Sequence, residues 1–191
     1  MLSHKIDDET ELRLIEPHHA EALNALIEGS LEHIREWSAW LKRERSIENT
    51  HDFIRRNMAR MGGGEGYGLA IWHRGEMAGQ VEYNYFDRDN RKTELGYWLG
   101  ASFQGRGLVT KSCRALIDHA FGDLDLNRVE MRCAVENVRS RRIPERLGFR
   151  QEGVLVRAEW MHDHFHDLVV YAVLADEWRA AGTGGDLARR A

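Results

Sequence analysis

Apolar residues along this chain change their spacing within one central segment, residues 94–121. From Glu94 to Leu99 the sequence ELGYWL is rich in aromatic and aliphatic residues and lacks proline, which predicts a strand. From Val109 to Phe121 the apolar residues recur every three or four positions, which predicts a helix with one buried face. Between them lies Gln104-Gly105-Arg106-Gly107. The segment therefore predicts a strand, a glycine-rich turn and a helix.

The spacing of apolar residues also predicts the strands and helices in the rest of the chain. Before residue 94 it predicts strands at Glu11–Ile15, Tyr67–Trp72 and Met77–Phe86, and helices after Pro17, after Ser30 and at Ile47–Met61. After residue 121 it predicts strands at Arg128–Val135, Val154–Met161 and Leu168–Leu174. A helix between the first two of these strands is expected to start near Ser140, so that Pro144 stays close to its first turn.

The glycine-rich turn predicts an anion site. The N–H groups in the first turn of a helix have no partner inside the helix, and the helix dipole favours negative charge at that end. Glycines in the turn let phosphate oxygens reach the backbone, because no side chain stands in the way. We therefore expect a phosphate-bearing ligand at Gln104–Thr110.

Two common phosphate motifs do not fit this turn. A P-loop starting at Gly100 would place Arg106 where a lysine must reach the phosphates, and Gly107 where a Ser or Thr must hold magnesium. A dinucleotide fingerprint needs three spaced glycines that open the helix, and only Gly105 and Gly107 are present. The ligand is therefore expected to be neither a P-loop nucleotide nor a dinucleotide bound in that way.

Composition narrows the class of protein. We expect one domain at 1–180, because 191 residues can bury a full core, and a flexible tail at 181–191. A formal net charge of -4 argues against a general nucleic-acid binder. Cys113 and Cys133 each fall in an apolar periodic segment, which indicates buried thiols in a reducing compartment. The sequence shows neither a signal-peptide pattern nor a long apolar run, so we expect a soluble cytoplasmic protein that does not span a membrane.

Several motifs, in a fixed order, resemble the GNAT acetyltransferases of the RimJ/RimL type, which acetylate the N-termini of ribosomal proteins. They are Glu94-Leu-Gly-Tyr97-Trp98-Leu99, Gln104-Gly-Arg-Gly107, Asn137-Val-Arg-Ser140, Gly148-Phe149 and Ala158-Glu159-Trp160. The pyrophosphate loop of the family has the pattern Arg/Gln-x-x-Gly-x-Gly/Ala. Its three specified positions correspond here to Gln104, Gly107 and Val109. Val109 departs from the pattern, which has a small residue, glycine or alanine, at that position. The resemblance covers nearly the whole chain, and several ordered motifs are stronger evidence than one.

The resemblance implies an α/β GNAT fold, with a mixed, mostly antiparallel seven-stranded sheet and helices on both faces. Its fourth and fifth strands, here Glu94–Leu99 and Arg128–Val135, would splay apart and admit the pantetheine of acetyl-CoA like an added strand. The residues implied to bind this co-substrate are Trp98, Leu99, Gln104, Gly105, Arg106, Gly107, Leu108, Val109, Thr110 and Asn137. Similar proteins often pair, so the resemblance also implies a homodimer.

The resemblance further implies the catalytic residues. Ser140 would protonate the departing thiolate, and the alternative is that Ser140 is simply the N-cap of its helix. Glu159 matches the family position of the general base that deprotonates the acceptor, and the alternative is a solvated strand residue. Glu94 is the rival base, because many GNAT enzymes carry one on the fourth strand.

Aromatic residues are candidates for the wall of the acceptor site. They are Trp37, Trp40, Tyr83, Tyr85 and Trp160. Trp37 and Trp40 are three residues apart, so they would share a helical face, and a plain core role is an equal alternative for them. In similar proteins the region between the first two helices covers the acceptor, which favours the functional interpretation.

Two further reactive groups have simpler explanations. His162, His164 and His166 alternate and could share a strand face as metal ligands, but they fall at a predicted hairpin tip without another ligand cluster. We therefore expect no metal. Cys133 alternates with apolar residues along its strand, which favours a buried thiol over a nucleophile.

We therefore expect an acetyl-CoA-dependent N-acetyltransferase that acts on a protein or peptide N-terminal α-amine, with a ribosomal protein among the candidate acceptors. A small amine, such as a polyamine or an antibiotic, is the alternative acceptor. An acetyl-CoA-binding module that has lost catalysis is the alternative from another class, and the presence of Ser140 and Glu159 argues against it.

Overall fold

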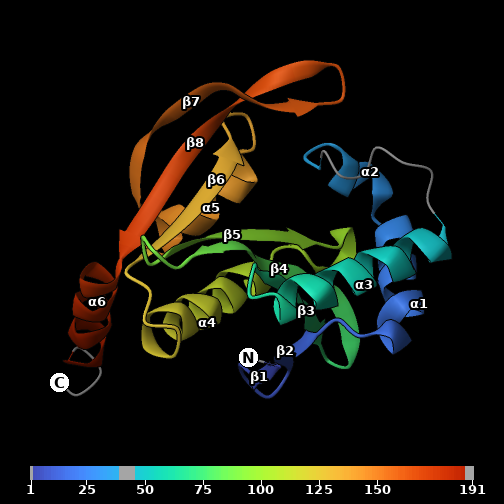
Figure 1. Cartoon of the computed structure of the whole chain (residues 1–191), viewed down its shortest axis with the longest axis horizontal. Coiled ribbons are helices and arrows are strands. Elements are labelled where there is room, and N and C mark those ends of the chain that lie inside the picture. The colour runs from blue at the N-terminus through green and yellow to red at the C-terminus, as the bar shows by residue number, and fades with distance from the viewer. Residues whose placement is uncertain (1, 39–45, 188–191) are drawn as a thin grey trace.

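The computed structural model describes residues 2–38 and 46–187 (Figure 1). Within them, one sheet of eight strands has the order β1-β2-β3-β4-β5-β6-β8-β7. The strands are β1 (Ser3–Lys5), β2 (Thr10–Leu14), β3 (Tyr67–His73), β4 (Glu76–Asp87), β5 (Lys92–Leu99), β6 (Arg128–Ala134), β7 (Arg150–Met161) and β8 (His164–Leu174). The β5–β6 pair is parallel and the other neighbouring pairs are antiparallel, so the mixed, mostly antiparallel sheet is confirmed.

The sheet has one strand more than the seven expected. Ser3–Lys5 folds back on β2 through a turn in which the N–H of Ile6 donates to the carbonyl of Thr10. The three residues of this strand are polar or basic and all are exposed. They carry no alternating apolar pattern, which is why the sequence did not predict the strand.

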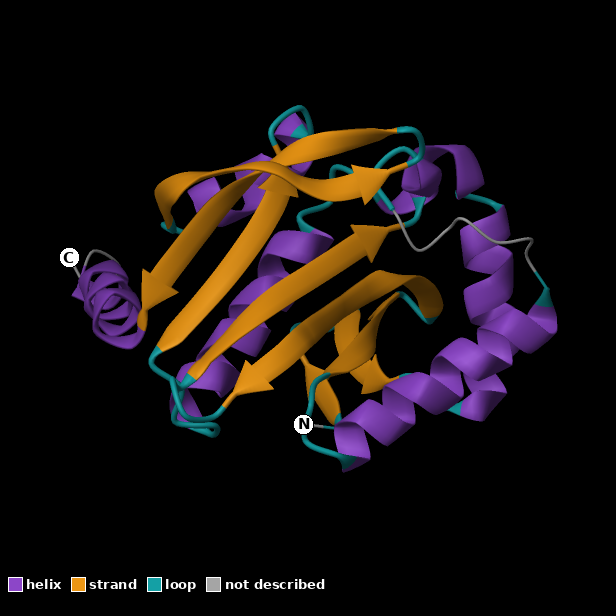
Figure 2. Cartoon of the chain, turned by 45° about the horizontal axis from the view of Figure 1, so that its top comes forward, coloured by secondary structure: helices purple, strands orange, loops and turns teal. Residues whose placement is uncertain are grey.

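Helices cover both faces of the sheet, as predicted (Figure 2). They are α1 (Ala20–Glu28), α2 (Leu31–Arg35), α3 (Ile47–Gly62), α4 (Leu108–Gly122), α5 (Val138–Arg146) and α6 (Ala175–Leu187), with short 3-10 helices at Pro17–His19 and Ala101–Phe103. Successive side chains of β3 point to opposite faces of the sheet, so this strand contributes to the helix layer on each face. Leu69 and Ile71 pack in the core that contains α4, while Ala70 packs in the cluster that contains α1 and α3.

The parallel strands β5 and β6 splay apart, as predicted. They pair only where Lys92–Glu94 faces Arg128–Glu130. Beyond that point, β5 continues to pair with β4 up to Leu99, and β6 continues to pair with β8 up to Ala134. Beyond these residues, the edges of β5 and β6 that face each other form no hydrogen-bonded ladder. The functional site is found in this gap in the middle of the sheet.

Two local predictions were wrong in their bounds. The helix after Ser30 was expected to reach Trp37 and Trp40, but α2 ends at Arg35, and residues 39–45 lie outside the described part of the chain. Helix α5 begins at Val138, ahead of Ser140, so Pro144 lies inside the helix. Helix α6 extends to Leu187, which is past the start of the tail expected at 181–191.

Within the described residues, none of the helices combines the length and the apolar character that crossing a bilayer requires.

Candidate active site

A cleft of about 1210 Å³ opens where β5 and β6 diverge. Its walls come from β5, the end of β6, the N-terminal end of α4, one side of α5, the segment around α2 and the strand β7. The predicted site residues that line it are Trp37, Trp98, Leu99, Gln104, Gly105, Gly107, Leu108, Val109, Thr110, Asn137, Ser140 and Glu159, together with the rival base Glu94. The structure therefore brings most of the predicted residues into one cavity.

The glycine-rich turn forms an open cradle at the start of α4. Gly105 and Gly107 have φ angles of 76° and 71°, a conformation that favours glycine, and Gly107 is the N-cap of α4. A Cβ added at either glycine would meet no protein atom within 4 Å. Both glycines line the cleft, so a ligand there can approach their backbone without meeting a side chain of the glycines themselves, as a phosphate site requires. Arg106 is not part of this lining, because its guanidinium turns back to the carbonyl of Ser102.

Gln104 links the turn to the opposite walls of the cleft. Its side-chain nitrogen lies 2.5 Å from Nε2 of His33 on α2, and its side-chain oxygen accepts from Arg139 of α5 over 3.1 Å. The turn is further anchored upstream, since the N–H of Ala101 donates to the hydroxyl of Ser30. Ser30 thus serves the loop and makes no side-chain cap bond to α2.

The N-cap of α5 is Asn137, and the alternative that assigned this cap to Ser140 is wrong. The side-chain oxygen of Asn137 accepts from the N–H of Ser140 over 3.0 Å. Ser140 is therefore a first-turn residue whose hydroxyl is available for other contacts. That hydroxyl donates to the Tyr97 oxygen over 3.2 Å and accepts from the Cys133 thiol over 3.5 Å. Burial raises the pKa of Tyr97 well above its usual value, so the phenol stays protonated.

Two carboxylates, Glu94 and Glu159, line the same cleft in different states. The oxygens of Glu94 are engaged: one accepts from Asn84 over 2.8 Å and the other pairs with Arg132 over 3.0 Å. Burial raises the pKa of Glu94 above its ordinary value, against the opposing effects of Asn84 and Arg132. In the part of the chain that the structure describes, no hydrogen bond or ion pair engages the carboxylate of Glu159. Glu159 is half-buried and is directed to the cleft.

A bulge in β7 aims Glu159 at the cleft. Leu155 pairs with Leu168 and Glu159 pairs with His166, so three residues of β7 lie opposite Asp167 alone. Within the bulge, Arg157 has a φ of 51° and its N–H donates to the carboxylate of Asp167 over 2.7 Å. Such bulges re-aim side chains and often occur next to functional sites.

Comparisons with known proteins agree with this geometry. A family model described as an acetyltransferase (GNAT) domain matches residues 10–150. The chain belongs to the GNAT acetyltransferases. It is 35% identical to YdaF of Bacillus subtilis (strain 168), named as a candidate ribosomal N-acetyltransferase, over 93% of this chain and 98% of YdaF.

Solved GNAT structures show the same fold. RimL, a ribosomal L7/L12 α-N-protein acetyltransferase solved with coenzyme A, is 29% identical with a TM-score of 0.87, over 91% of this chain and 98% of RimL. MccE, a microcin C7 self-immunity acetyltransferase solved with acetyl-CoA and AMP, is 32% identical with a TM-score of 0.85, over 89% of this chain and 94% of MccE. This GNAT protein is an N-acetyltransferase, and its co-substrate is acetyl-CoA.

Of the aromatic residues predicted for the acceptor wall, one of the four that the structure describes lines this GNAT cleft. Trp37 lines it and packs against the small cluster of Ala134, Met161 and Leu168. Trp40 lies outside the described residues. The remaining three are placed elsewhere by the strand geometry.

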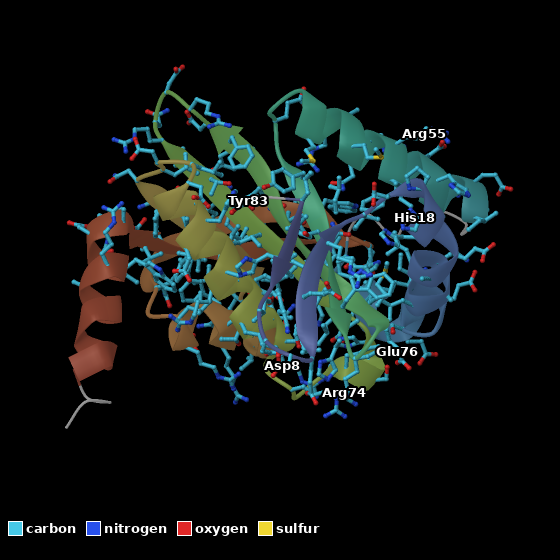
Figure 3. All side chains as sticks on the ribbon, turned by 90° about the horizontal axis from the view of Figure 1, so that it is seen from below. Asp8, His18, Arg55, Arg74, Glu76 and Tyr83 are labelled. Atoms are coloured by element: carbon cyan, nitrogen blue, oxygen red, sulfur yellow. The ribbon has the colours of Figure 1, made fainter. Side chains whose placement is uncertain are left out.

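Tyr83 was wrongly expected in the cleft. Its side chain, labelled in Figure 3, is fully buried, and its hydroxyl donates to the carbonyl of Leu116 in α4. Tyr85 pairs with Glu94 across the β4–β5 ladder but does not line the cleft. A register shift between these two tyrosines leaves Asn84 at the irregular position, and Asn84 lines the cleft in their place. Trp160 is next to Glu159 on β7, points the other way and stacks edge-on against Phe165.

The alternating histidines make separate contacts, and a group of possible metal ligands lies elsewhere, at Glu16, His18 and His19, whose ligand atoms lie within 4.8 Å of one another. His162 bonds the carbonyl of Arg35, His164 pairs with Asp163, and His166 is buried with its nearest carboxylate, Glu136, at 3.6 Å. Both cysteines are free and buried, as predicted. Burial raises the pKa of Cys133, which keeps it a neutral thiol beside Ser140.

Sequence reasoning missed several residues of the GNAT cleft. Asn84, Tyr97, Arg132 and the arginines of α5 at 139, 142 and 146 all line it. Tyr97 stood within the quoted strand motif, and the three arginines have helical spacing after Asn137, so a signal for both was present in the sequence. Asn84 and Arg132 are brought there by cross-strand register, which the sequence pattern does not reveal.

Proposed function

We propose that this enzyme transfers the acetyl group of acetyl-CoA to the α-amine of a protein or peptide N-terminus, with a ribosomal protein as the acceptor class. The observation that carries the proposal is a single cleft that holds a bare phosphate cradle, the hydroxyl of Ser140 and the unengaged carboxylate of Glu159. The names of YdaF and RimL, which refer to ribosomal acceptors, support the acceptor class.

The cradle at Gln104–Thr110 would hold the pyrophosphate of CoA. Gly105 and Gly107 leave the backbone accessible, and the first-turn N–H groups of α4 supply donors together with a favourable dipole. Pantetheine would then lie in the gap along β5, whose Trp98 and Leu99 pair with β4 on their other side. We assign Leu99 and its neighbours to orient the thioester and Asn137 to contact the pantetheine amides through its side-chain nitrogen.

In the proposed reaction, the neutral amine attacks the thioester carbon, and the carbon–sulfur bond breaks. Glu159 takes the proton that the amine nitrogen loses, and Ser140 gives a proton to the departing thiolate. The N-terminal α-amine has a pKa near ~8, so a carboxylate is an adequate base at neutral pH. The proton taken by Glu159 then returns through solvent to the oxygen of Ser140 as the thiolate is protonated, so that the net products are the acetylated amine and free CoA thiol and both side chains recover their starting state.

Glu159 is preferred to Glu94 as the base because of its contacts. A base must have a lone pair within reach of the amine proton, and both oxygens of Glu94 are occupied by Asn84 and Arg132. The raised pKa of Glu94 is the one observation that favours the rival, since it makes that carboxylate the stronger proton acceptor. Geometry takes precedence here, and the two variants compared in the Discussion decide between them.

Initial rates of CoA release with a matched set of acceptors test the proposed acceptor. The set is a peptide with a free N-terminus, the same peptide with a blocked N-terminus and a free lysine, spermidine, and an aminoacyl-nucleotide. We expect turnover with the free N-terminus and none with the blocked peptide. Turnover with spermidine alone would overturn the peptide assignment, and acetyl-CoA binding without turnover on any acceptor would overturn catalysis.

A small aminoacyl compound is the second candidate acceptor. The supporting observation is the structural similarity to MccE, which was solved with acetyl-CoA and AMP. The aminoacyl-nucleotide in the acceptor set separates this candidate from the peptide: a kcat/KM for that compound well above the value for the peptide would favour it.

We also propose a homodimer in the cytoplasm, where thiols such as the two free cysteines stay reduced. β7 is an edge strand, and with β8 it exposes Val154, Leu155, Val156, Trp160 and Phe165. A second copy packed on this apolar surface would cover both the edge and the side chains. Sedimentation should show a dimer that Val156→Glu dissociates; a monomeric wild-type protein would contradict the proposal.

A further inference from the structure

One side of α5 presents arginines to the cleft that the proposed chemistry does not use. Arg139, Arg142 and Arg146 all line the cavity. They are three and four residues apart, so they project from the same side of the helix. The carboxylates Glu94 and Glu159 lie on other elements, β5 and β7. The basic side of α5 is therefore available to the co-substrate rather than to the reacting amine.

None of these guanidinium groups has a carboxylate partner among the described residues, and Arg139 donates instead to the neutral amide of Gln104. Within residues 2–38 and 46–187, no carboxylate lies within 4.0 Å of Arg142 or Arg146. The arginines of β6 differ in this respect, because Arg128 pairs with Glu152 and Arg132 pairs with Glu94. Unpaired guanidinium groups on the wall of a cleft are suited to an anionic ligand, above all to phosphate oxygens that accept paired N–H bonds.

The position of Arg139 indicates which anion this is. Arg139 donates to Gln104, the first residue of the phosphate cradle, and so marks the part of α5 next to the pyrophosphate. A helix rises about 1.5 Å per residue, which places Arg142 and Arg146 roughly 4.5 and 10.5 Å further along α5. CoA carries one more phosphate in this direction from pantetheine, on the ribose 3′ oxygen. A phosphate monoester has a charge of about -1.5 to -2 near neutral pH, which two guanidinium groups balance.

We propose that Arg142 and Arg146 bind the 3′-phosphate of CoA and make the enzyme select CoA over dephospho-CoA, which lacks only that phosphate. The inference rests on the proposed placement of the CoA pyrophosphate at Gln104–Thr110. It assigns to these two side chains a role in ligand discrimination and none in the acetyl-transfer step.

The test is the dissociation constant of CoA and of dephospho-CoA, measured by titration calorimetry for wild type, Arg142→Gln, Arg146→Gln and the double variant. Wild type should bind CoA about 10- to 100-fold more tightly than dephospho-CoA. The double variant should lose that preference, because its affinity for CoA falls by the same factor while its affinity for dephospho-CoA is nearly unchanged. Arg56→Gln, at an exposed arginine of α3, should leave both constants at wild-type values.

Two results overturn the inference and point to different errors. If the double variant weakens both ligands by the same factor, or neither, the 3′-phosphate is bound elsewhere and the placement of CoA in the cleft is unaffected. If wild-type protein binds neither ligand, the proposed placement of the co-substrate fails together with the inference. A melting temperature within a few degrees of wild type confirms that each variant is folded.

Discussion

The hydroxyl of Tyr97 donates a hydrogen bond to the main-chain carbonyl of Ser140 over 3.0 Å. In a regular helix the N–H of residue 144 would donate to that carbonyl, but Pro144 has no N–H. Tyr97 replaces the missing donor from the neighbouring strand β5. The same phenol oxygen accepts from the side-chain hydroxyl of Ser140 over 3.2 Å. One tyrosine therefore satisfies the backbone that the proline leaves open and orients the proposed acid.

This relationship predicts an energetic coupling between Tyr97 and Pro144. Tyr97→Phe should lower the free energy of unfolding by about 1–3 kcal/mol, because a half-buried carbonyl loses its donor. In a Pro144→Ala background the N–H of residue 144 can serve Ser140, so the same substitution should cost about 1 kcal/mol less. Urea unfolding of the four proteins measures the coupling. An equal cost in both backgrounds would show that the tyrosine does not replace the missing helix bond.

The phosphate cradle predicts that Gly107→Ala weakens acetyl-CoA binding at least about tenfold, because a methyl group would occupy the space next to the first turn of α4. Alanine at a φ of 71° also carries a backbone cost of about 1–2 kcal/mol. Gly75, with a φ of 81° and no atom within 4 Å of an added Cβ, is the matched control in the β3–β4 turn. Gly75→Ala should lose similar stability and keep wild-type affinity. An unchanged dissociation constant for a folded Gly107→Ala protein would exclude this loop as the pyrophosphate site.

Ser140→Ala should lower kcat by about 10²-fold and leave the dissociation constant of acetyl-CoA nearly unchanged, since its hydroxyl acts on the departing thiolate. Loss of a helix cap is not the expected cause, because Asn137 caps α5. Ser46, which does cap α3 by accepting from Asn49, provides the comparison. Ser46→Ala should lower stability by about 1 kcal/mol with kcat unchanged. Turnover of Ser140→Ala at the wild-type rate would remove this residue from the mechanism.

The sequence predicted the strand, turn and helix of the site better than it predicted the residues that strand pairing brings into the cleft. The strand at 94–99, the glycine-rich turn and the helix after it are local, and each is specified by its own spacing, which the structure confirms in β5 and α4. The bulges are not local. Asn84 reaches the cleft because β4 slips by one residue against β5, and Glu159 does so because three residues of β7 face Asp167. Both depend on pairing with another strand, which a single sequence pattern does not encode.

The exposed ion pairs of Glu152 predict how stability changes in acid. Hydrogen bonds from Arg128, joined by Arg150, lower the pKa of Glu152 to about 2. The stabilisation is fully present above the ordinary pKa of a glutamate, about 4.3, and is lost as the pH falls through the folded-state pKa of about 2. Glu152→Gln should therefore be less stable than wild type at neutral pH, by less than about 1 kcal/mol for an exposed pair, and the difference should disappear only when the pH is well below that pKa. A difference that persists unchanged in acid would contradict the ionic origin.

The pH dependence of catalysis separates the two candidate bases. Burial raises the pKa of Glu94, so activity that depends on ionised Glu94 would fall away at a higher pH than for an ordinary carboxyl. Each carboxylate can be replaced by its isosteric amide, which keeps the shape and removes proton acceptance. Glu94→Gln also removes the ion pair with Arg132, so its melting temperature must be measured beside its activity.

Whether Glu159 takes the proton of the acceptor amine is tested most directly by kcat for Glu159→Gln and Glu94→Gln, measured side by side with saturating acetyl-CoA and one peptide acceptor. We predict that Glu159→Gln lowers kcat by about 10²–10⁴-fold at neutral pH with acetyl-CoA binding unchanged, and that Glu94→Gln keeps most of its activity. Raising the pH toward the pKa of the amine, near ~8, should restore part of the loss, because more acceptor then arrives neutral. Loss of turnover in Glu94→Gln, with wild-type rates in Glu159→Gln across this pH range, would contradict the assignment and place the base on β5.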